Sequence, residues 1–361
     1  MMRQFIKSLV IALSTILILT LFSCSPKTTE PEPANFSVSD LTITPNKAVI
    51  GSPVDVEILV TNSGDLGGTY EATLYIDNVV EEKKEVTLDG NSSQKVSFTV
   101  NKTLAKFYSV NVGGQVGAFT MTLGRIIIDA AHGGEPNQIS NFVGRLQVMG
   151  YEVYKKTDII KSGDLDGSLI LMIIFSLDTE QPYSPSELTG IDKFVRDGGG
   201  LLVIGENVWN EQHLSYINQI TENYGIRYNF DHLCDPTNYT GYAGPNETTP
   251  IFTQGNFTHP ILKGVKEIRC SYSNSLFTSG SAQPIVWGDE DSYTTGANSS
   301  NRLQKPGTNP PFIALSHVGK GRVVCVGSAT PFSNFAIEDG DNLQLGLNLI
   351  SFAASTLPKM P

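Results

Sequence analysis

The sequence predicts two domains, a β-sandwich followed by an α/β domain with a doubly wound, mainly parallel sheet. Three observations support this fold class. At 361 residues the chain is long enough to bury two separate cores. Up to about residue 123, short alternating strands are separated by turn residues, which is typical of a sandwich. From residue 124 onward, strands alternate with amphipathic helices, as a parallel sheet with crossover helices requires.

The first residues are predicted to be a leader and no part of the fold. Arg3 and Lys7 precede an uncharged apolar run, residues 8–24. A positive region, an apolar region and a small-residue ending are typical of a signal peptide. The alternative is an uncleaved transmembrane helix, which needs ~20 apolar residues, and this run is at the short edge of that range.

The end of the run favours the signal peptide. Residues 21–24, LFSC, resemble a lipobox, where prokaryotic lipoproteins are cleaved and lipidated. We expect a signal peptide over residues 1–23, lipid on Cys24 and a Pro-rich tether over residues 24–35. The resemblance implies a protein anchored by lipid to the extracytoplasmic face of the cell membrane.

The charge balance disfavours nucleic-acid partners. The formal net charge is −11, and cleavage would remove two positive charges to leave −13. Such an acidic chain repels phosphate backbones, and no basic stripe is visible.

The cysteines beyond Cys24 do not have metal-binding spacing. Cys234 and Cys270 flank a loop-rich stretch, and either a disulfide or two unpaired thiols fit this setting. Cys325 stands inside an apolar strand pattern and is expected to be a buried thiol.

The expected sandwich covers residues 36–123. Its predicted strands occupy residues 38–44, 54–62, 69–78, 85–90, 94–100 and 107–113. The block at residues 44–78 and the strand at residues 94–100 resemble the CARDB family of immunoglobulin-like domains in prokaryotic surface proteins. The resemblance implies an adhesion or spacer role and supplies no catalytic residues.

The expected α/β domain covers residues 124–357. Strands are predicted at residues 125–129, 151–155, 169–175 and 201–205, with helices at about 139–149, 185–197 and 211–224 between or after them. Residues 231–300 are expected to form long loops with short strands at 266–272 and 284–288. A hairpin at 312–318 and 321–327 and a final helix, 343–352, end the domain.

The stretch at residues 125–135, RIIIDAAHGGE, suggests metal chemistry. A strand followed by D-x-x-H-G-G-E resembles the start of zinc-dependent N-acetylmuramoyl-L-alanine amidases, which implies a zinc ligand at His132. A catalytic zinc needs about three protein ligands. No further His appears until His213, inside a predicted helix, so the ligand set is incomplete.

Landmarks along the whole domain point elsewhere. Residues 126–134, 193–200, 259–265, 319–324 and 341–350 stand in an order that resembles the class I glutamine-amidotransferase-like superfamily, closest to its DUF4350 and GIFT-type branch. This implies a flavodoxin-like fold with a cysteine nucleophile on the turn after the 201–205 strand. Here that turn holds Glu206 and Asn207, so we expect a catalytically degenerate domain that is no enzyme and needs no cofactor or metal.

Several polar residues nevertheless follow strand ends, where ligands bind in open α/β sheets. The candidate ligand-binding residues are Asp129, His132, Glu206, Asn207, Ser328 and Asn342. The alternative is that they cap turns and helix starts, as we also expect of Asp341 and Asn342 before the last helix.

The sequence therefore favours a non-enzymatic surface lipoprotein that binds a protein or glycan partner. A Tyr-, Asn- and Thr-rich stretch between residues 238 and 300 suits such surfaces. One alternative is a metal-dependent hydrolase of cell-wall or envelope glycans, with Asp129, His132 and Glu206 on the metal. Another is an accessory subunit of an envelope transport system.

Overall fold

A computed structural model describes residues 30–134, 136–161, 163–175, 181–205, 210–242, 247–297 and 301–354. The predicted lipidation residue Cys24 and the elbow residues Glu206 and Asn207 lie outside these ranges. Within them, no helix has the length and apolar character needed to cross a membrane. The chain divides into two compact units, one centred on Val54–Val100 and Tyr108–Phe119 and one on Thr120–Pro361, with Asn46–Pro53 and Asn101–Phe107 grouped with the second.

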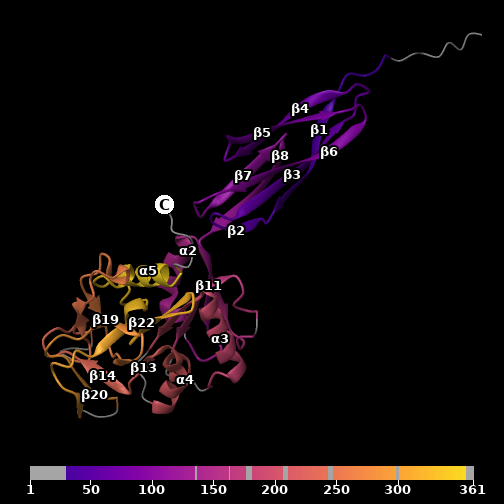
Figure 1. The fold of residues 1–361 in the computed structure, drawn as a ribbon. Helices are drawn as coiled ribbons and strands as arrows, with labels where there is room; N and C mark the ends of the chain where they lie inside the picture. Colours follow the sequence, from indigo (N-terminus) through magenta and orange to yellow (C-terminus); the bar gives the residue numbers. More distant parts are fainter. Residues whose placement is uncertain are drawn as a thin grey trace, which may run out of the picture. The chain divides into compact units, whose positions relative to one another are not determined.

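The first unit is a β-sandwich, as predicted (Figure 1). One sheet has the order β1-β3-β6, formed by Phe36–Thr44, Pro53–Asn62 and Ser92–Asn101. The other has the order β2-β8-β7-β4-β5, formed by Lys47–Val49, Gln115–Thr122, Phe107–Val112, Gly68–Ile76 and Val79–Leu88. Alternate side chains of β3, from Val54 to Val60, are fully buried, so the period of two places one face of the strand in the core.

The sequence analysis missed two strands of the sandwich, β2 and β8. The strand β8 follows β7 after Gly113 and Gly114, which have positive φ angles of 57° and 85°. Two glycines in this conformation make a tight hairpin. The last strand predicted for the sandwich ends at residue 113, so β8 lies beyond it.

The second unit contains a mixed sheet of eight strands. Its order is β10-β9-β11-β12-β23-β22-β19-β16, formed by Tyr151–Lys156, Gly124–Asp129, Ser168–Ile174, Gly200–Ile204, Gly321–Val326, Pro311–Val318, Gln283–Trp287 and Gln254–Gly255. The pairings from β10 to β23 are parallel, and the remaining three are antiparallel. Strand outweighs helix among the residues that the structure describes, and the predicted flavodoxin-like architecture is not evident from them.

Helices cover both faces of the parallel strands (Figure 1). The helices α2, Ser140–Val148, and α5, Asn342–Ala353, pack on one face, and α3, Pro185–Asp197, and α4, Glu211–Thr221, pack on the other. In β11 alternate side chains enter the two cores, Met172 on one side and Leu171 on the other. This explains why the strand is apolar throughout.

Helix α3, predicted at residues 185–197, begins with a local capping motif. Ser184 is the N-cap, Pro185 follows it, and Ser184 forms a capping box with Glu187. The helix ends at Gly198, whose φ of 125° lies in a region that glycine adopts readily and other residues rarely adopt. The capping box fixes the position of Glu187, which has a second role below.

Residues 226–304 contain more regular structure than we predicted. Short strands form three small sheets in the described part of this segment. In the first, β13 (Ile226–Tyr228) pairs with β18 (Leu276–Thr278), and in the second, β14 (Asp231–Cys234) pairs with β20 (Tyr293–Gly296), which also pairs with β21 (Arg302–Gln304). In the third, β15 (Ile251–Phe252) pairs with β17 (Ile268–Arg269). Strands of two to four residues are too short to show a period of two in the sequence. The expected strand at 266–272 is reduced to β17.

Candidate functional site

Asp129 ends strand β9 at the carboxyl edge of the parallel strands. Its side chain is 2% exposed and accepts three hydrogen bonds. The oxygen Oδ1 accepts the backbone N–H of Ala131 at 2.9 Å. The oxygen Oδ2 lies 2.9 Å from Nδ1 of His132 and accepts the hydroxyl of Tyr183 at 2.6 Å.

The two glycines of the HGG sequence allow the chain to turn tightly after β9. Gly133 has a φ of 85°, in the left-handed region. A Cβ atom on Gly134 would lie 2.7 Å from the carbonyl oxygen of Ile174 and 2.9 Å from that of Asp129. The backbone can therefore approach two strand ends at once, and the turn returns His132 to Asp129.

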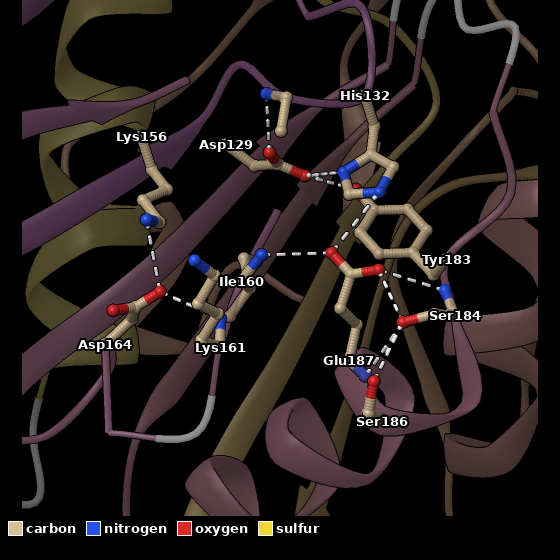
Figure 2. A network of polar contacts seen from close by, with 11 residues as sticks. Asp129, His132, Lys156, Ile160, Lys161, Asp164, Tyr183, Ser184, Ser186 and Glu187 are labelled. Carbon is tan, nitrogen blue, oxygen red and sulfur yellow. Dashed lines mark hydrogen bonds and ion pairs between the residues drawn. The ribbon is translucent and has the colours of Figure 1, made fainter. Parts of the chain in front are cut away.

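His132 is enclosed, and both of its ring nitrogens face carboxylates (Figure 2). Its Nε2 lies 3.4 Å from Oε1 of Glu187, opposite the Nδ1 contact with Asp129. The ring of Tyr183 stacks on the imidazole with a centroid distance of 3.8 Å and an interplanar angle of 20°. His132 is 6% exposed and Tyr183 is 4% exposed.

Glu187 is fixed by donors from two segments. Its Oε1 accepts the backbone N–H of Ile160 at 3.0 Å. Its Oε2 accepts the backbone N–H of Ser184 at 3.0 Å and the Ser184 hydroxyl at 2.8 Å. The carboxylate is 2% exposed, so these donors and His132 replace its water shell.

The electrostatics of this cluster favour a charged imidazole and a neutral phenol. Burial lowers the pKa of His132, but the hydrogen bond to Asp129 and the charges of Asp129 and Glu187 outweigh it and raise the pKa above its ordinary value. Burial, followed by the Asp129 carboxylate, raises the pKa of Tyr183 well above its usual range. Tyr183 is therefore a hydrogen-bond donor at any physiological pH.

Comparison with known proteins identifies the family. The model of a "Domain of unknown function (DUF4350)" matches residues 161–350, more than half of the chain. The chain belongs to the DUF4350 family. No curated protein matches it.

Several solved structures align with parts of this DUF4350 chain. The "mmIFT52 N-terminal domain" aligns with a TM-score of 0.52 and 19% identity, covering 65% of this chain and all of that one. A CARDB domain from Pyrococcus furiosus, solved with di-metal ions, aligns at 19% identity and a TM-score of 0.23, covering 26% of this chain and 99% of that one. A β-glucosidase from Erythrobacter marinus aligns at 15% identity and a TM-score of 0.24, covering 25% of this chain and 16% of that one.

Ser328 and Asn342 of this DUF4350 chain bond backbone groups of neighbouring segments. The Ser328 hydroxyl donates to the carbonyl oxygen of Ser271 at 3.1 Å. The amide of Asn342 bonds both backbone groups of Arg269, at 3.0 and 2.9 Å, and also the carbonyl oxygen of Ala336. Both side chains are 1% exposed or less.

The predicted N-cap of the last helix is confirmed in its position at Asp341, but no side-chain cap bond forms there. The Oδ2 atom of Asp341 instead accepts the backbone N–H groups of Lys266 and Glu267. Tertiary contacts to the neighbouring loop have replaced the local cap.

The alternative of a disulfide between Cys234 and Cys270 is not what the structure shows. Both are free, buried thiols. The sulfur of Cys234 lies 3.9 Å from Oγ1 of Thr295, whereas that of Cys270 lies 3.7 Å from the carbonyl oxygen of Ser271. Burial, the largest cause, raises the pKa of Cys234 to about 11 and that of Cys270 to about 12.

A small cavity lies at the carboxyl edge. Its volume is about 70 Å³, and its lining residues are Gln138, Ile139, Ile174, Ala329, Thr330, Ser333 and Phe335. Phe335 is 66% exposed and meets the ring of Tyr242 edge-on, with centroids 5.6 Å apart. No charged side chain lines the cavity among the residues described, so neutral groups suit it best.

Three carboxylates of the outer loops form a second cluster that the sequence analysis missed. The cluster consists of Asp235, Asp289 and Asp291, whose carboxylate oxygens lie within 4.8 Å of one another. Within the described part of the chain, this is the group of Asp, Glu, His or Cys side chains that is close enough to hold a cation. Burial raises the pKa of Asp235, and the contact with Asp289 raises the pKa of Asp291. The sequence separation of more than fifty residues between Asp235 and the other two concealed this cluster.

Sequence reasoning also missed Tyr183 and Glu187 as partners of His132. The signal for Glu187 was present, because a Ser-Pro-x-Glu start predicts a fixed, buried carboxylate in the first turn. The contact between Glu187 and His132 depends on the parallel pairing of β9 with β11, which places the turn after β9 beside the start of α3.

Proposed function

We propose that this chain is a non-enzymatic surface lipoprotein whose α/β domain binds a protein or glycan partner at the carboxyl edge of its parallel strands. The observation that carries this proposal is the engagement of both ring nitrogens of His132 with carboxylates. A general base or a metal ligand needs a nitrogen lone pair that is open to the reacting group. The geometry of His132 leaves neither nitrogen open.

The other candidate residues at this edge support binding over catalysis. Asp129 uses both oxygens on donors of the fold. The Ser328 hydroxyl donates to a backbone carbonyl, which cannot accept a proton as a catalytic base would. These side chains therefore stabilise the edge of the sheet and leave contact with a partner to the loops around it.

The cavity beside Phe335 is the place where we expect the partner. It lies where ligands bind in open α/β sheets, outside the carboxyl ends of strands. Phe335 is exposed at its rim and offers an aromatic surface for a sugar ring or an apolar side chain. The absence of charge among the described lining residues fits a neutral group.

We further infer that the α/β domain is a degenerate member of the amidotransferase-like superfamily. The parallel strands stand in the order β10-β9-β11-β12-β23, which numbered along the chain is 2-1-3-4-5, the order of doubly wound folds. Glu206 and Asn207 follow β12 where a nucleophilic cysteine would stand. Cys325 lies inside β23, and burial raises its pKa to about 12, so its thiol does not replace that nucleophile.

The lipid anchor and the sandwich complete the proposal. We propose that lipid on Cys24 holds the protein at the extracytoplasmic face of the membrane and that the CARDB-like sandwich acts as a spacer. Labelling of the expressed chain with a fatty-acid analogue, with Cys24→Ser as the control, tests the anchor. Label on the Cys24→Ser variant would contradict it.

The binding proposal is tested with the full chain in detergent. Binding to peptidoglycan, to immobilised glycans and to envelope proteins is compared between the natural protein and Phe335→Ala, with the exposed Val148 on α2 changed to Ala as a matched control. We expect Phe335→Ala to weaken binding and Val148→Ala to leave it unchanged. Equal binding by all three proteins would show that the partner does not bind at this cavity.

A metal-dependent hydrolase is the competing function, because Asp129 and His132 do lie in contact. Metal analysis of the purified protein and assays of peptidoglycan and glutamine hydrolysis with and without zinc separate the two. Stoichiometric zinc together with turnover that His132→Ala abolishes would establish the hydrolase and refute the binding module.

A further inference from the structure

We propose that His132 is the titrating element of a pH-sensitive latch that fastens the turn after β9 to the start of helix α3. The latch consists of Asp129, His132, Tyr183 and Glu187 (Figure 2). In its closed state the ring of His132 joins the turn after β9 to Glu187 of α3, beside the bond between Asp129 and the Tyr183 hydroxyl. The existence of the latch does not depend on the proposed function.

The geometry itself requires a protonated ring. Nδ1 faces Oδ2 of Asp129, and Nε2 faces Oε1 of Glu187. A neutral imidazole carries one N–H and one lone pair, whereas the imidazolium carries two N–H groups. Both contacts are favourable only in the imidazolium, since a neutral ring would direct a lone pair at one of the carboxylates.

The charges around the ring are accounted for on every side. The residues that act on it are Asp129 from β9, Glu187 from α3 and the neutral phenol of Tyr183 on its face. Lys156 of β10, which Figure 2 also draws, pairs with Asp164 at 3.1 Å. Among the described residues, the imidazolium is therefore the positive charge that contacts both buried carboxylates.

Loss of the proton opens the contact to Glu187 and leaves the remaining bonds in place. Asp129 keeps the Ala131 and Tyr183 donors, and Glu187 keeps the capping box with Ser184. The longer contact, 3.4 Å to Glu187, is the weaker of the two and loses its donor first. The fold survives, and the turn loses its contact with Glu187, while the Asp129–Tyr183 bond still holds the end of β9.

The direction of the pH effect follows from the sign of the shift. Since the folded-state pKa of His132 is raised above the ordinary value of about 6.5, the latch contributes fully below that value. Its contribution is lost as the pH rises through the raised pKa. One proton is involved, so the equilibrium between closed and open latch changes by up to about tenfold per pH unit in this window.

The released turn leads towards the cavity. Gly134 packs against the carbonyl oxygen of Ile174, and Gln138 and Ile139, a few residues further on, line the cavity with Ile174. Opening the latch therefore loosens one wall of the cavity. This last step rests on the proposed function, whereas the titration of His132 does not.

The test is an NMR titration of the full chain in detergent with labelled histidine. The chain has five histidines, and single substitutions assign their signals. We expect the His132 signal to titrate above its ordinary pKa and to shift downwards in Glu187→Gln, which keeps a side chain that can still bond at the helix cap. His213→Asn is the matched control and should leave the His132 signal unchanged.

Two outcomes would overturn the latch. One is a His132 signal in the natural protein that titrates at or below its ordinary pKa, which needs no variant to fold. The other is a His132 signal that titrates at the same pH in the folded Glu187→Gln variant as in the natural protein. If the latch titrates as expected but partner binding is independent of pH, only the link to the cavity fails.

Discussion

Tyr183 and Asp129, 54 residues apart in the sequence, share a hydrogen bond of 2.6 Å in a fully enclosed site. The accepting oxygen also receives His132, so a single carboxylate oxygen holds two side chains from separate segments. The phenol keeps its proton because burial and the neighbouring carboxylate both disfavour its anion. Removal of the Tyr183 hydroxyl oxygen alone would therefore destabilise the cluster.

We expect Tyr183→Phe to destabilise the fold by about 1–3 kcal/mol, because a hydrogen bond to a buried charged group is lost while the stacked ring remains. Urea unfolding monitored by circular dichroism measures the change. Tyr154→Phe is the control, since its hydroxyl bonds Glu152 at an exposed site. Similar effects of the two variants would show that the Asp129 bond is no stronger than a surface contact.

Gly134→Ala should destabilise the protein markedly, because the new Cβ would meet two backbone oxygens at 2.7 and 2.9 Å that cannot move independently. Gly144→Ala in α2 is the matched control, since nothing lies within 4 Å of its Cβ position. Alanine is the better helix former, so we expect this control to gain about 0.5–1 kcal/mol. Thermal unfolding measures the melting temperature of both variants. A rise in the melting temperature of Gly134→Ala as well as of Gly144→Ala would contradict the close packing of the turn.

Asp291→Asn should raise the melting temperature at neutral pH in EDTA. The contact with Asp289 raises the pKa of Asp291, so the charged form is disfavoured in the folded state. For an acid with a raised pKa, stability is greatest when the group is protonated and falls as the pH rises through that pKa. The gain should therefore vanish at acid pH, whereas Asp158→Asn, at an exposed position, should have no effect at either pH.

All three cysteines of the folded domains should be free. Unreduced protein, denatured and alkylated, should carry label on Cys234, Cys270 and Cys325 by mass spectrometry. Native protein should react slowly, because burial raises all three thiol pKa values to about 11 or 12. Recovery of label on Cys325 alone would restore the disulfide alternative.

The long periodic elements could be predicted from the sequence, and the small sheets could not. The alternation in β3, the unbroken apolar run of β11 and the capping box of α3 are local signals, and each element formed as expected. Strands such as Ile251–Phe252 and Ile268–Arg269 exist because they pair with each other, and a pair of residues carries no period. Their pairing is a tertiary event.

The candidate site was only half visible for the same reason. The sequence marked Asp129 and His132, since both follow a strand end within four residues, and the structure brings them into contact. Ser328 and Asn342 also follow or begin elements, yet they bond backbone groups elsewhere. Tyr183 and Glu187 complete the cluster through the arrangement of the sheet and helix, which a local pattern does not record.

The double role of Glu187 has a consequence for the order of folding. Its capping box with Ser184 closes within one helical turn and can form as soon as α3 nucleates, whereas its contact with His132 requires β9 and α3 to have docked. We therefore expect the ring contact to be absent from the folding transition state. Stopped-flow kinetics of His132→Asn should show faster unfolding with an unchanged refolding rate, so the latch would lengthen the lifetime of the native state without hastening its formation.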